Sequence, residues 1–382
     1  MGNYLTHLNL IAMEQREERD MPKNNDTLKI YEGFLLEVDA FSKIPEDLWG
    51  VHTQSSISCW QQCEKKYEYK YEKGYRSAEI IAAYLIGSAV HIGLEYFWES
   101  MPYHAAVTAV NEFFTENATY FDGDGALERA KIIAYIKGYY HKWTPSKDEY
   151  EVISAELRFF KEHDFTQWFG WEELKDWEQA TVGLRISGKL DVLLRRRIDG
   201  KLFIMEHKTA GAYSKADEPG STYWMKLAMD TQLILYKFVL EAISGEEVGV
   251  IYDVVMKSGM RLLKGKARKR ASESELDFAM RKAEGAETLS QFQGRINEDY
   301  MNEPERYQRR EIHHTKEELI NKMDELINIM NRINRTDLRV RNTTNCNSYG
   351  SPCEFLGVCT GIEQLDDPKF EKKEAMHEEL KS

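Results

Sequence analysis

The spacing of hydrophobic residues changes part-way along the chain, and the change predicts two kinds of structure. Helical spacing runs through residues 56–75 and 78–98 and covers most of residues 104–140. Beyond residue 150, runs rich in β-branched and aromatic residues predict strands at 152–160, 180–197, 201–208 and 248–257, with a helix at 223–244. The pattern therefore predicts an α/β fold in which helices accompany a central sheet.

Both ends of the chain differ from this middle part. Residues 1–54 are polar and weakly periodic, which predicts a polar extension. Thr315 and Glu318 form a capping box at the start of an amphipathic helix, and a cysteine-containing segment follows that helix. We therefore expect the extension, a helical region at 55–145, a core at 146–310, the helix with the cysteine segment at 311–362, and a charged tail at 363–382.

Asp199 and Gly200 predict a tight turn between two of the strands. An Asp-Gly pair favours a two-residue type I′ turn, because both central positions need a positive φ. In a hairpin closed by that turn, Asp191 lies directly opposite Lys208. Since side chains alternate along a strand, the side chains of Asp191, Glu206 and Lys208 are expected on one face.

These three charged groups are suited to phosphodiester hydrolysis. The carboxylates of Asp191 and Glu206 could share one ion, and oxygen ligands favour Mg²⁺ or Mn²⁺. Such an ion activates a water molecule, while the ammonium group of Lys208 orients that water or offsets developing charge. The alternative is an ion pair between Asp191 and Lys208 at a sheet edge. Hydrophobic residues on both faces of the two strands favour a covered hairpin, where buried charge is costly without a function.

The composition excludes several classes of protein. Of the 382 residues, 42% are hydrophobic and 30% are charged, which is typical of a folded globular chain. The net charge is −13, so any site for a polyanion must be local. No apolar run reaches the roughly 20 residues that a bilayer requires, so we expect no membrane partner. Five cysteines and no signal peptide indicate a reducing compartment, the cytoplasm.

The order of Asp191, then Glu206-x-Lys208 on the next strand, resembles the signature of the PD-(D/E)XK nuclease superfamily. Two further pairs, one on a preceding helix and one on a following helix, resemble the RecB-like branch: Gly87 with His91, and Gln232 with Tyr236. The resemblance implies a restriction-endonuclease-like core, in which a mixed central sheet is flanked by helices and carries helical insertions.

The resemblance also implies roles for individual residues. Asp191, Glu206 and His91 would bind the metal, and Lys208 would serve the attacking water. On the residues alone, His91 on an apolar helix is more often a core residue, with Glu95 one turn further along its face.

Two helix residues and one strand residue complete the candidate site. Gln232 and Tyr236 would engage the substrate in the family, although on the residues alone they could equally pack a helix. Gln232 could also hold Lys208 in place of a substrate phosphate. Glu156, on the strand before the hairpin, is interpreted as structural or as support for a metal ligand.

The cysteines suggest a second metal site. Cys346, Cys353 and Cys359 form a loop-rich group of three soft ligands that needs a fourth, and Cys63 is a better candidate than Cys59. Four thiolates suit either a [4Fe-4S] cluster or Zn²⁺, and the spacing alone does not decide between them.

One cysteine before the nuclease core and three after it resemble the iron-sulfur subset of these nucleases. That subset includes AddB-type helicase-nucleases, CRISPR adaptation nucleases, exonuclease V and related phage enzymes. Cys63 and Tyr67 match its Cys-Pro-x-x-aromatic segment, while Glu64 departs from the usual proline. The resemblance implies a [4Fe-4S] cluster that joins the two ends of the domain.

Together these features favour a Mg²⁺- or Mn²⁺-dependent DNA exonuclease. The resemblance implies action at or from single-stranded ends, in recombination or repair, in a prokaryotic or phage-infected cell. It also implies a helicase or a single-strand annealing protein as a partner. The alternatives are a non-catalytic DNA-binding module with a structural iron-sulfur or zinc site, which would not need Asp191, Glu206 and Lys208, and an electron-transfer protein, which leaves the hairpin unexplained.

Overall fold

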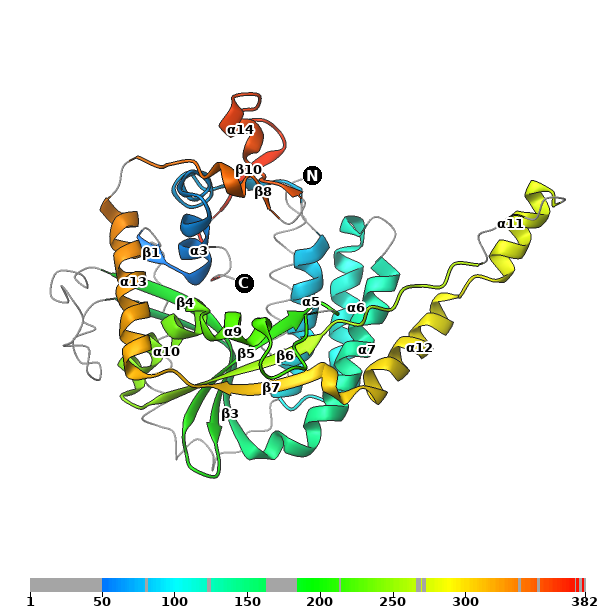
Figure 1. Ribbon diagram of the computed structural model, residues 1–382, viewed down its shortest axis with the longest axis horizontal. Helices are drawn as coiled ribbons and strands as arrows, with labels where there is room; N and C mark the ends of the chain where they lie inside the picture. The colour runs from blue at the N-terminus through cyan, green and yellow to red at the C-terminus, as the bar shows by residue number, and fades with distance from the viewer. Residues whose placement is uncertain are drawn as a thin grey trace. The chain divides into compact units, whose positions relative to one another are not determined.

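A mixed six-stranded β-sheet forms the centre of the fold (Figure 1). The computed structural model describes residues 50–79, 82–121, 125–162, 184–212, 214–265, 269, 273–335, 338–348, 351–374, 376–377 and 380. The strands of the sheet are β1 (Val51–His52), β3 (Tyr150–Glu162), β4 (Arg185–Arg196), β5 (Leu202–Ala210), β6 (Val248–Met256) and β7 (Tyr307–Ile312). Their order is β1-β4-β5-β6-β7, and β3 also pairs with β4.

Parallel and antiparallel pairs alternate in this sheet. Strand β4 is antiparallel to β3 and β5, β5 is parallel to β6, and β6 is antiparallel to β7. The mixed sheet with flanking helices confirms the predicted α/β class, and it fits a restriction-endonuclease-like core. Of the predicted extension, residues 1–49 lie outside the described residues, whereas Val51 and His52 form β1, which is parallel to β4.

Strand β4 is divided between two partners on one edge. Strand β3 pairs with one edge of β4 along its whole length, so β1 and β5 both pair with the opposite edge of β4. Strand β1 pairs with residues 185–186 and β5 pairs with residues 192–195. In the described part of the chain, residues 187–191 therefore have no strand partner on this edge. The opening between β1 and β5 lies directly beside Asp191.

The loop between β4 and β5 is longer than the sequence predicts. The N–H of Arg196 donates to the carbonyl of Lys201 at 2.9 Å, so residues 197–200 form a four-residue loop. The predicted two-residue turn at Asp199 and Gly200 is therefore wrong. The physical reason is the Asp199 carboxylate, which accepts hydrogen bonds from the Lys201 N–H and from the Arg196 side chain and stabilises the wider loop.

The longer loop changes the register without changing the faces. Val192 pairs with Met205, so Asp191 comes opposite Glu206 and not opposite Lys208, as the tight turn predicted. The shift is two residues, which preserves the alternation of side chains.

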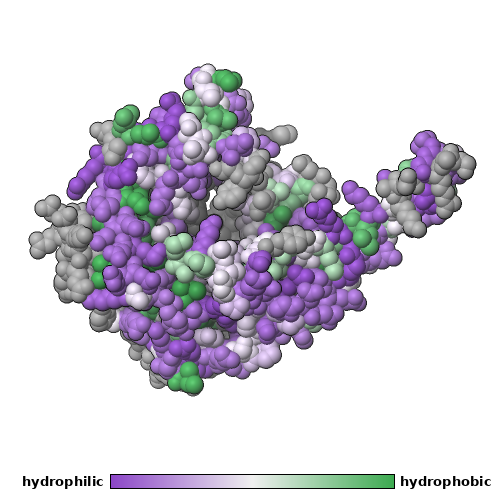
Figure 2. All heavy atoms as spheres, in the orientation of Figure 1, coloured by the Kyte–Doolittle hydropathy of each residue, from purple (hydrophilic) through white to green (hydrophobic). Residues whose placement is uncertain are grey.

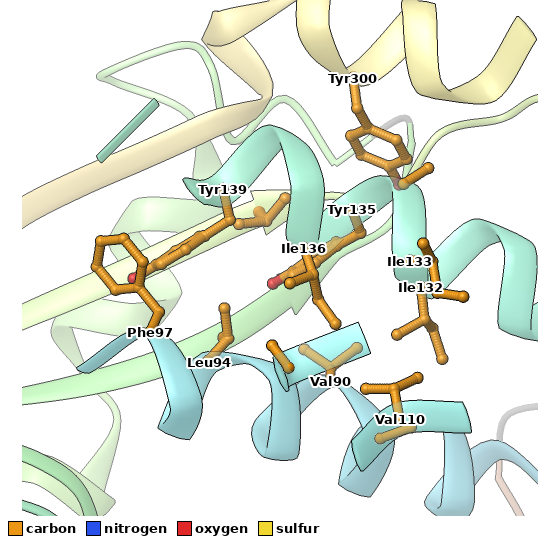
Figure 3. Packing of buried hydrophobic residues seen from close by; sticks show 14 of the residues in the cluster. Val90, Leu94, Phe97, Val110, Ile132, Ile133, Tyr135, Ile136, Tyr139 and Tyr300 are labelled. Carbon is orange, nitrogen blue, oxygen red and sulfur yellow. The ribbon is translucent and has the colours of Figure 1, made fainter. Parts of the chain in front are cut away.

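Four helices build the main hydrophobic core against the sheet: α5 (Ala82–Trp98), α6 (Tyr103–Glu116), α7 (Gly125–Trp143) and α12 (Leu289–Asn302). Their buried side chains interdigitate, as Figure 3 shows for Leu94, Ile136 and Tyr300 among others. Helices α5 and α7 approach closely at Gly93, where an added Cβ would lie 2.1 Å from Ile136 Cδ1. Figure 2 shows mostly hydrophilic residues over one face of the molecule.

Helix α10 (Thr231–Ser244) contacts β4, β5 and β6, and α13 (Lys316–Arg335) packs against it. The single helix predicted at 223–244 is instead two helices, α9 (Thr222–Ala228) and α10. The break arises because Asp230 caps α10 by accepting a hydrogen bond from the N–H of Gln232. The capping box of Thr315 and Glu318 is confirmed, with reciprocal bonds of 2.8 and 3.2 Å.

The remaining elements are short or peripheral. They are α3 (Gln54–Gln62), α4 (Glu64–Tyr67), a π-helical turn (Glu68–Glu72), β2 (Tyr75–Ser77), α11 (Glu275–Glu284), β8 (Asn347–Ser348), β9 (Ser351–Pro352), α14 (Leu356–Thr360), β10 (Phe370–Lys372) and 3₁₀ turns at Ala118–Tyr120, Thr144–Glu149, Pro304–Arg306 and Thr343–Asn345. None of the described helices is long and apolar enough to cross a membrane.

Candidate active site

Asp191 lies where β4 and β5 separate. The ladder between the strands ends at Val192 and Met205, so the next inward N–H of β5, that of His207, has no carbonyl of β4 to bind. The Asp191 side chain takes that place and accepts the hydrogen bond on Oδ2 at 2.7 Å. Its other oxygen, Oδ1, is left available for another ligand or cation.

His91 and Glu156 lie on the other side of this carboxylate. Nδ1 of His91, on α5, is 3.4 Å from Asp191 Oδ1 and 3.9 Å from Glu156 Oε1. One ligand atom from each of these three residues lies within 4.8 Å of the others, a spacing that could hold a metal ion. Glu156, which the sequence indicated only as a lesser candidate, is thus brought into the group with His91 and Asp191.

The backbone at Glu156 is held in a strained conformation. Its φ is +54°, in the left-handed region that a residue with a Cβ rarely adopts, and the β3–β4 register is shifted between Val152 and Ser154 just before it. Its carboxylate also forms an ion pair with Lys189. Strained residues of this kind concentrate at functional sites, because the surrounding structure must stabilise them.

Glu206 and Lys208 lie on β5, in contact with the first turn of α10. Glu206 Oε1 accepts hydrogen bonds from Lys208 Nζ at 2.8 Å and from Gln232 Nε2 at 2.7 Å. Lys208 Nζ also donates to Gln232 Oε1 at 2.8 Å. Gln232 therefore bridges the carboxylate of Glu206 and the ammonium group of Lys208. Contact with Lys208 was one of the two roles that the sequence suggested for Gln232.

The electrostatics of the two acids differ. Burial acts to raise the pKa of Asp191, but the charge of His91 and the hydrogen bond from His207 outweigh it and bring the pKa to about 2. Burial, followed by the negative charge of Asp191, raises the pKa of Glu206 to about 7 against the effect of Lys208. Two neighbouring carboxylates that oppose each other's ionisation form a site that a cation would stabilise.

The cations of the site are held in their charged forms. Burial lowers the pKa of His91, but the carboxylates of Asp191 and Glu156 outweigh burial and raise the pKa to about 9. Burial likewise lowers the pKa of Lys208, and the carboxylate of Glu206 outweighs it, so that the pKa lies above its usual value.

The donor set fits a hard divalent cation. Glu206 Oε2 is buried and has no hydrogen-bond partner among the described residues, which is costly unless a ligand satisfies it. Carboxylate oxygens with one imidazole nitrogen are ligands that Mg²⁺ and Mn²⁺ accept. Of the predicted metal ligands, His91 and Asp191 belong to the group of close ligand atoms, which Glu156 completes, whereas Glu206 is not part of it.

Tyr236 lies beneath this site and not at its surface. Its side chain is buried and packs edge-on against Phe159 at 5.2 Å between ring centres. An added Cβ on Gly188 would lie 2.7 Å from Tyr236 Cε1, so the ring fills the space beside β4. Burial and the charge of Glu206 raise the pKa of Tyr236 well above its ordinary value, so it remains a neutral phenol.

The family model of the PD-(D/E)XK nuclease superfamily matches residues 52–360. The chain belongs to that superfamily. The matched range includes the sheet from His52 onward and every candidate residue of this site. Nucleases of this superfamily use divalent metals, in agreement with the donor set around Asp191.

Solved structures and curated proteins add little to this assignment. A candidate exonuclease from Eubacterium rectale is 13% identical with a TM-score of 0.42, and the match covers 92% of this chain and 96% of that one. The protein SSO0001 is 12% identical with a TM-score of 0.33, and the match covers 88% of this chain and 98% of that one. No curated protein matches the chain.

In this PD-(D/E)XK nuclease, the cysteine segment lies against the first helices of the matched range. Asn342 donates from its backbone N–H to Cys63 Sγ at 3.4 Å and from its side chain to the carbonyl of Gln62 at 2.9 Å. Cys346 Sγ is 3.9 Å from the carbonyl of Asn342, and the carbonyl of Cys346 accepts the N–H of Cys353 at 2.8 Å. Cys63 and Cys346 are therefore neighbours across nearly the whole sequence.

A small apolar cluster supports the same region. Tyr69, Phe355 and Phe370 are buried together, and Cys353 and Cys359 pack against them. The four predicted ligands thus border one region of the fold. No three thiols lie within 4.8 Å of one another among the described residues, which include all five cysteines.

Cys59 lies apart from this arrangement. It is buried with Trp60, Tyr67 and Tyr71 in a hydrophobic cluster, and burial raises the pKa of its thiol to about 11.

Proposed function

We propose that this protein is a divalent-metal-dependent deoxyribonuclease that degrades DNA as an exonuclease. The observation that supports this most is the buried, unpartnered Oε2 of Glu206 beside Asp191, with Lys208 fixed against the same glutamate. Burying a carboxylate oxygen without a partner is costly, and a cation bound beside Asp191 would satisfy it. Membership of the superfamily supplies the substrate class, DNA.

The protein's residues would divide the chemistry between them. Asp191, Glu206 and His91 would hold Mg²⁺ or Mn²⁺, with Glu156 as a further ligand, and the metal would activate water and stabilise charge on the phosphate. Lys208 would orient the attacking water or offset the developing charge through an ammonium that Glu206 and Gln232 hold in place.

Gln232 and Tyr236 would act in different ways. The side chain of Gln232 is half-buried at the start of α10, where it can exchange its bond with Lys208 for a substrate phosphate. Tyr236, buried below, would support Gln232 and β4 more than it would contact DNA. Action at single-stranded ends, a role in recombination or repair, and a helicase or annealing protein as partner complete the proposal.

We also infer that Cys63, Cys346, Cys353 and Cys359 hold a [4Fe-4S] cluster. Four thiolates suit either the cluster or a single Zn²⁺ ion. The order of one cysteine before the nuclease core and three after it supports the cluster, since this order resembles the iron-sulfur subset of these nucleases. The contacts of Asn342 with Cys63 and Cys346 bring the two ends of the set close together.

Digestion of labelled DNA would test the proposed function. Linear single-stranded, linear duplex and circular substrates would be incubated with Mg²⁺, with Mn²⁺ and with a chelator. We expect metal-dependent release of short products from linear DNA and protection of circular DNA. Equal cleavage of circles would show an endonuclease, and DNA binding without cleavage in any metal would favour the non-catalytic DNA-binding module.

A further inference from the structure

A row of polar side chains crosses the sheet directly behind the candidate metal site. His207, Asp253 and Arg309 stand opposite one another in the registers of β5, β6 and β7. His207 lies between Glu206 and Lys208, so its side chain points to the opposite face of the sheet. The three side chains are only 5%, 0% and 8% exposed. The row is therefore buried in the core, on the face of the sheet opposite Glu206 and Lys208.

Asp253 is the centre of the row. Its Oδ2 lies 3.0 Å from Nδ1 of His207 and accepts a hydrogen bond from the Tyr139 hydroxyl. Its Oδ1 accepts a hydrogen bond from Nε of Arg309 at 3.2 Å. The guanidinium of Arg309 in turn stacks on Trp143, 3.9 Å from the ring centre. Hydrogen bonds from α7 and β7 therefore hold the buried carboxylate, and the His207 ring of β5 lies at ion-pair distance from it, with neither ring nitrogen in a hydrogen bond to the described residues.

The row is connected to both kinds of proposed ligand. The backbone N–H of His207 donates to Asp191 Oδ2, so the position of the β5 backbone at this residue sets the direction of that carboxylate. The His207 ring lies 6.4 Å from the ring of His91 and is stacked at 6.5 Å against Trp98, both on α5. One side chain thus lies between the strand that orients Asp191 and the helix that carries His91.

We propose that His207, Asp253 and Arg309 form a positioning row that aligns Asp191 and His91 for metal binding. Strand β4 leaves β5 before residue 207, so at that point the β5 backbone is held on one edge alone, by its parallel pairing with β6. The contact of the His207 side chain with Asp253 adds a second constraint at the same residue. A hydrophobic residue could fill the same volume, but it could not fix the direction of the ring or of the backbone N–H above it.

This inference rests on the proposed function and is tested by metal binding. Mn²⁺ binding would be measured directly, without DNA, in the full-length wild-type protein and in His207→Leu, which keeps a similar volume but loses the contact with Asp253. We expect His207→Leu to bind Mn²⁺ roughly ten-fold more weakly. The rate at saturating Mn²⁺ should stay close to that of the wild type, because the ligands themselves are intact.

His207→Gln is the conservative variant, since its amide can still donate to Asp253, and it should recover most of the affinity. Tyr139→Phe removes one donor to Asp253 without touching a ligand and should cause a smaller shift in the same direction. If His207→Leu fails to fold, the shift in Tyr139→Phe decides the question in its place.

The matched control is Glu241→Gln. Glu241 forms a buried ion pair with Lys237 on α10, and Glu241 binds the N–H of Val248 at the far end of β6. Breaking this pair should lower the melting temperature without changing Mn²⁺ affinity. A folded His207→Leu protein with wild-type Mn²⁺ affinity would overturn the positioning row, as would an equal loss of affinity in Glu241→Gln. Mn²⁺ binding that follows the expected pattern in a protein unable to cleave DNA would uphold the row and reject the proposed nuclease.

Discussion

The candidate active site and the cysteine region are built from opposite kinds of contact. The active site lies on the sheet: Asp191, Glu206 and Lys208 come from residues 191–208 of two adjoining strands, and Glu156 comes from the neighbouring strand β3. The cysteine region joins Cys63 to residues that follow α13. Its described connections include side-chain bonds from Asn342 and Asn345 to Gln62, ion pairs of Arg332 with Glu64 and of Arg339 with Glu72, one backbone bond from Lys65 to Val340, a short β2–β10 pair and a small apolar cluster.

The difference shows how each region should depend on its metal. Backbone pairing and the hydrogen bonds of Asp191, Glu206 and Lys208 fix the active site before any ion binds. Few backbone bonds hold the cysteine region, so a bound cluster would supply much of its stability. Loss of the active-site metal should therefore affect rate, and loss of the cluster should affect folding.

The largest effect expected from this contrast is on stability, in Cys63→Ser. Anaerobically purified wild-type protein should be brown and contain about four irons per chain, and the variant should lose both properties. It should also lose on the order of 5 kcal/mol in free energy of unfolding, because the cluster closes a loop of nearly three hundred residues. Iron analysis and denaturant titration would measure the two losses.

Cys59→Ala is the matched control, one turn earlier on α3. It should stay brown and lose only about 1 kcal/mol, as expected when a small buried group is removed. Bleaching of Cys59→Ala with colour retained in Cys63→Ser would reverse the assignment of the fourth ligand. One zinc and no iron in the wild type would keep the link but reject the cluster.

The next largest effect is on rate, in Lys208→Ala. Removing the ammonium should reduce the cleavage rate about a thousand-fold or more, since electrostatic stabilisation of the transition state is lost. DNA binding and melting temperature should change little. Lys201→Ala is the control, because Lys201 lies on the same hairpin and forms an ion pair with the exposed Glu247. Turnover at the wild-type rate in purified Lys208→Ala would reject the assignment.

A smaller effect is expected at His91, which we place among the metal ligands. His91→Ala should raise the Mn²⁺ concentration needed for half-maximal activity by roughly ten- to a hundred-fold, and excess Mn²⁺ should restore part of the rate. The measurement is a metal titration of nuclease activity. An unchanged titration curve would make His91 a core residue that happens to lie beside Asp191.

The smallest expected effect is at Glu156, where two variants distinguish the backbone strain from the role of the carboxylate in metal binding. Glu156→Gly and Glu156→Ala both remove the carboxylate, so both should weaken metal activation equally. Only glycine tolerates the φ of +54° without steric cost, so Glu156→Gly should be about 1 kcal/mol more stable than Glu156→Ala. Equal unfolding free energies for the two variants would mean that the bulge relaxes when its side chain is lost.

The sequence predicted those parts of the fold that depend on local pattern. The strands at 152–160, 201–208 and 248–257 and the helix after Thr315 were predicted close to their observed bounds, because alternation and capping are local signals. The turn at Asp199 was wrong because its carboxylate binds Arg196 and stabilises a wider loop. The single helix at 223–244 was wrong because Asp230 caps a second one.

The parts of the site that the sequence missed depend on distant segments. Nothing near Asp253 or Arg309 indicates that both lie behind the active site, since the pairing of β6 with β7 spans residues far apart in the chain. The position of Glu156 beside Asp191 depends on a bulge in β3, and no residue pattern in the sequence predicts that bulge. The role of His207 could not be predicted from its position in the chain, because only the pairing of β5 with β6 places Asp253 beside it.

The pairing of β2 with β10 has a consequence for how the protein is made. Residues 75–77 meet residues 370–372, so α3 and Cys63 have been synthesised long before the segment that covers them. At 5–20 residues per second, this interval lasts roughly 15 to 60 s. During that time the early cysteines remain exposed to oxidants and to stray metal ions. Delivery of iron and sulfur, if it occurs as we propose, is therefore a step that follows translation, and its success would depend on the cell keeping one thiol reduced while the ribosome finishes the chain.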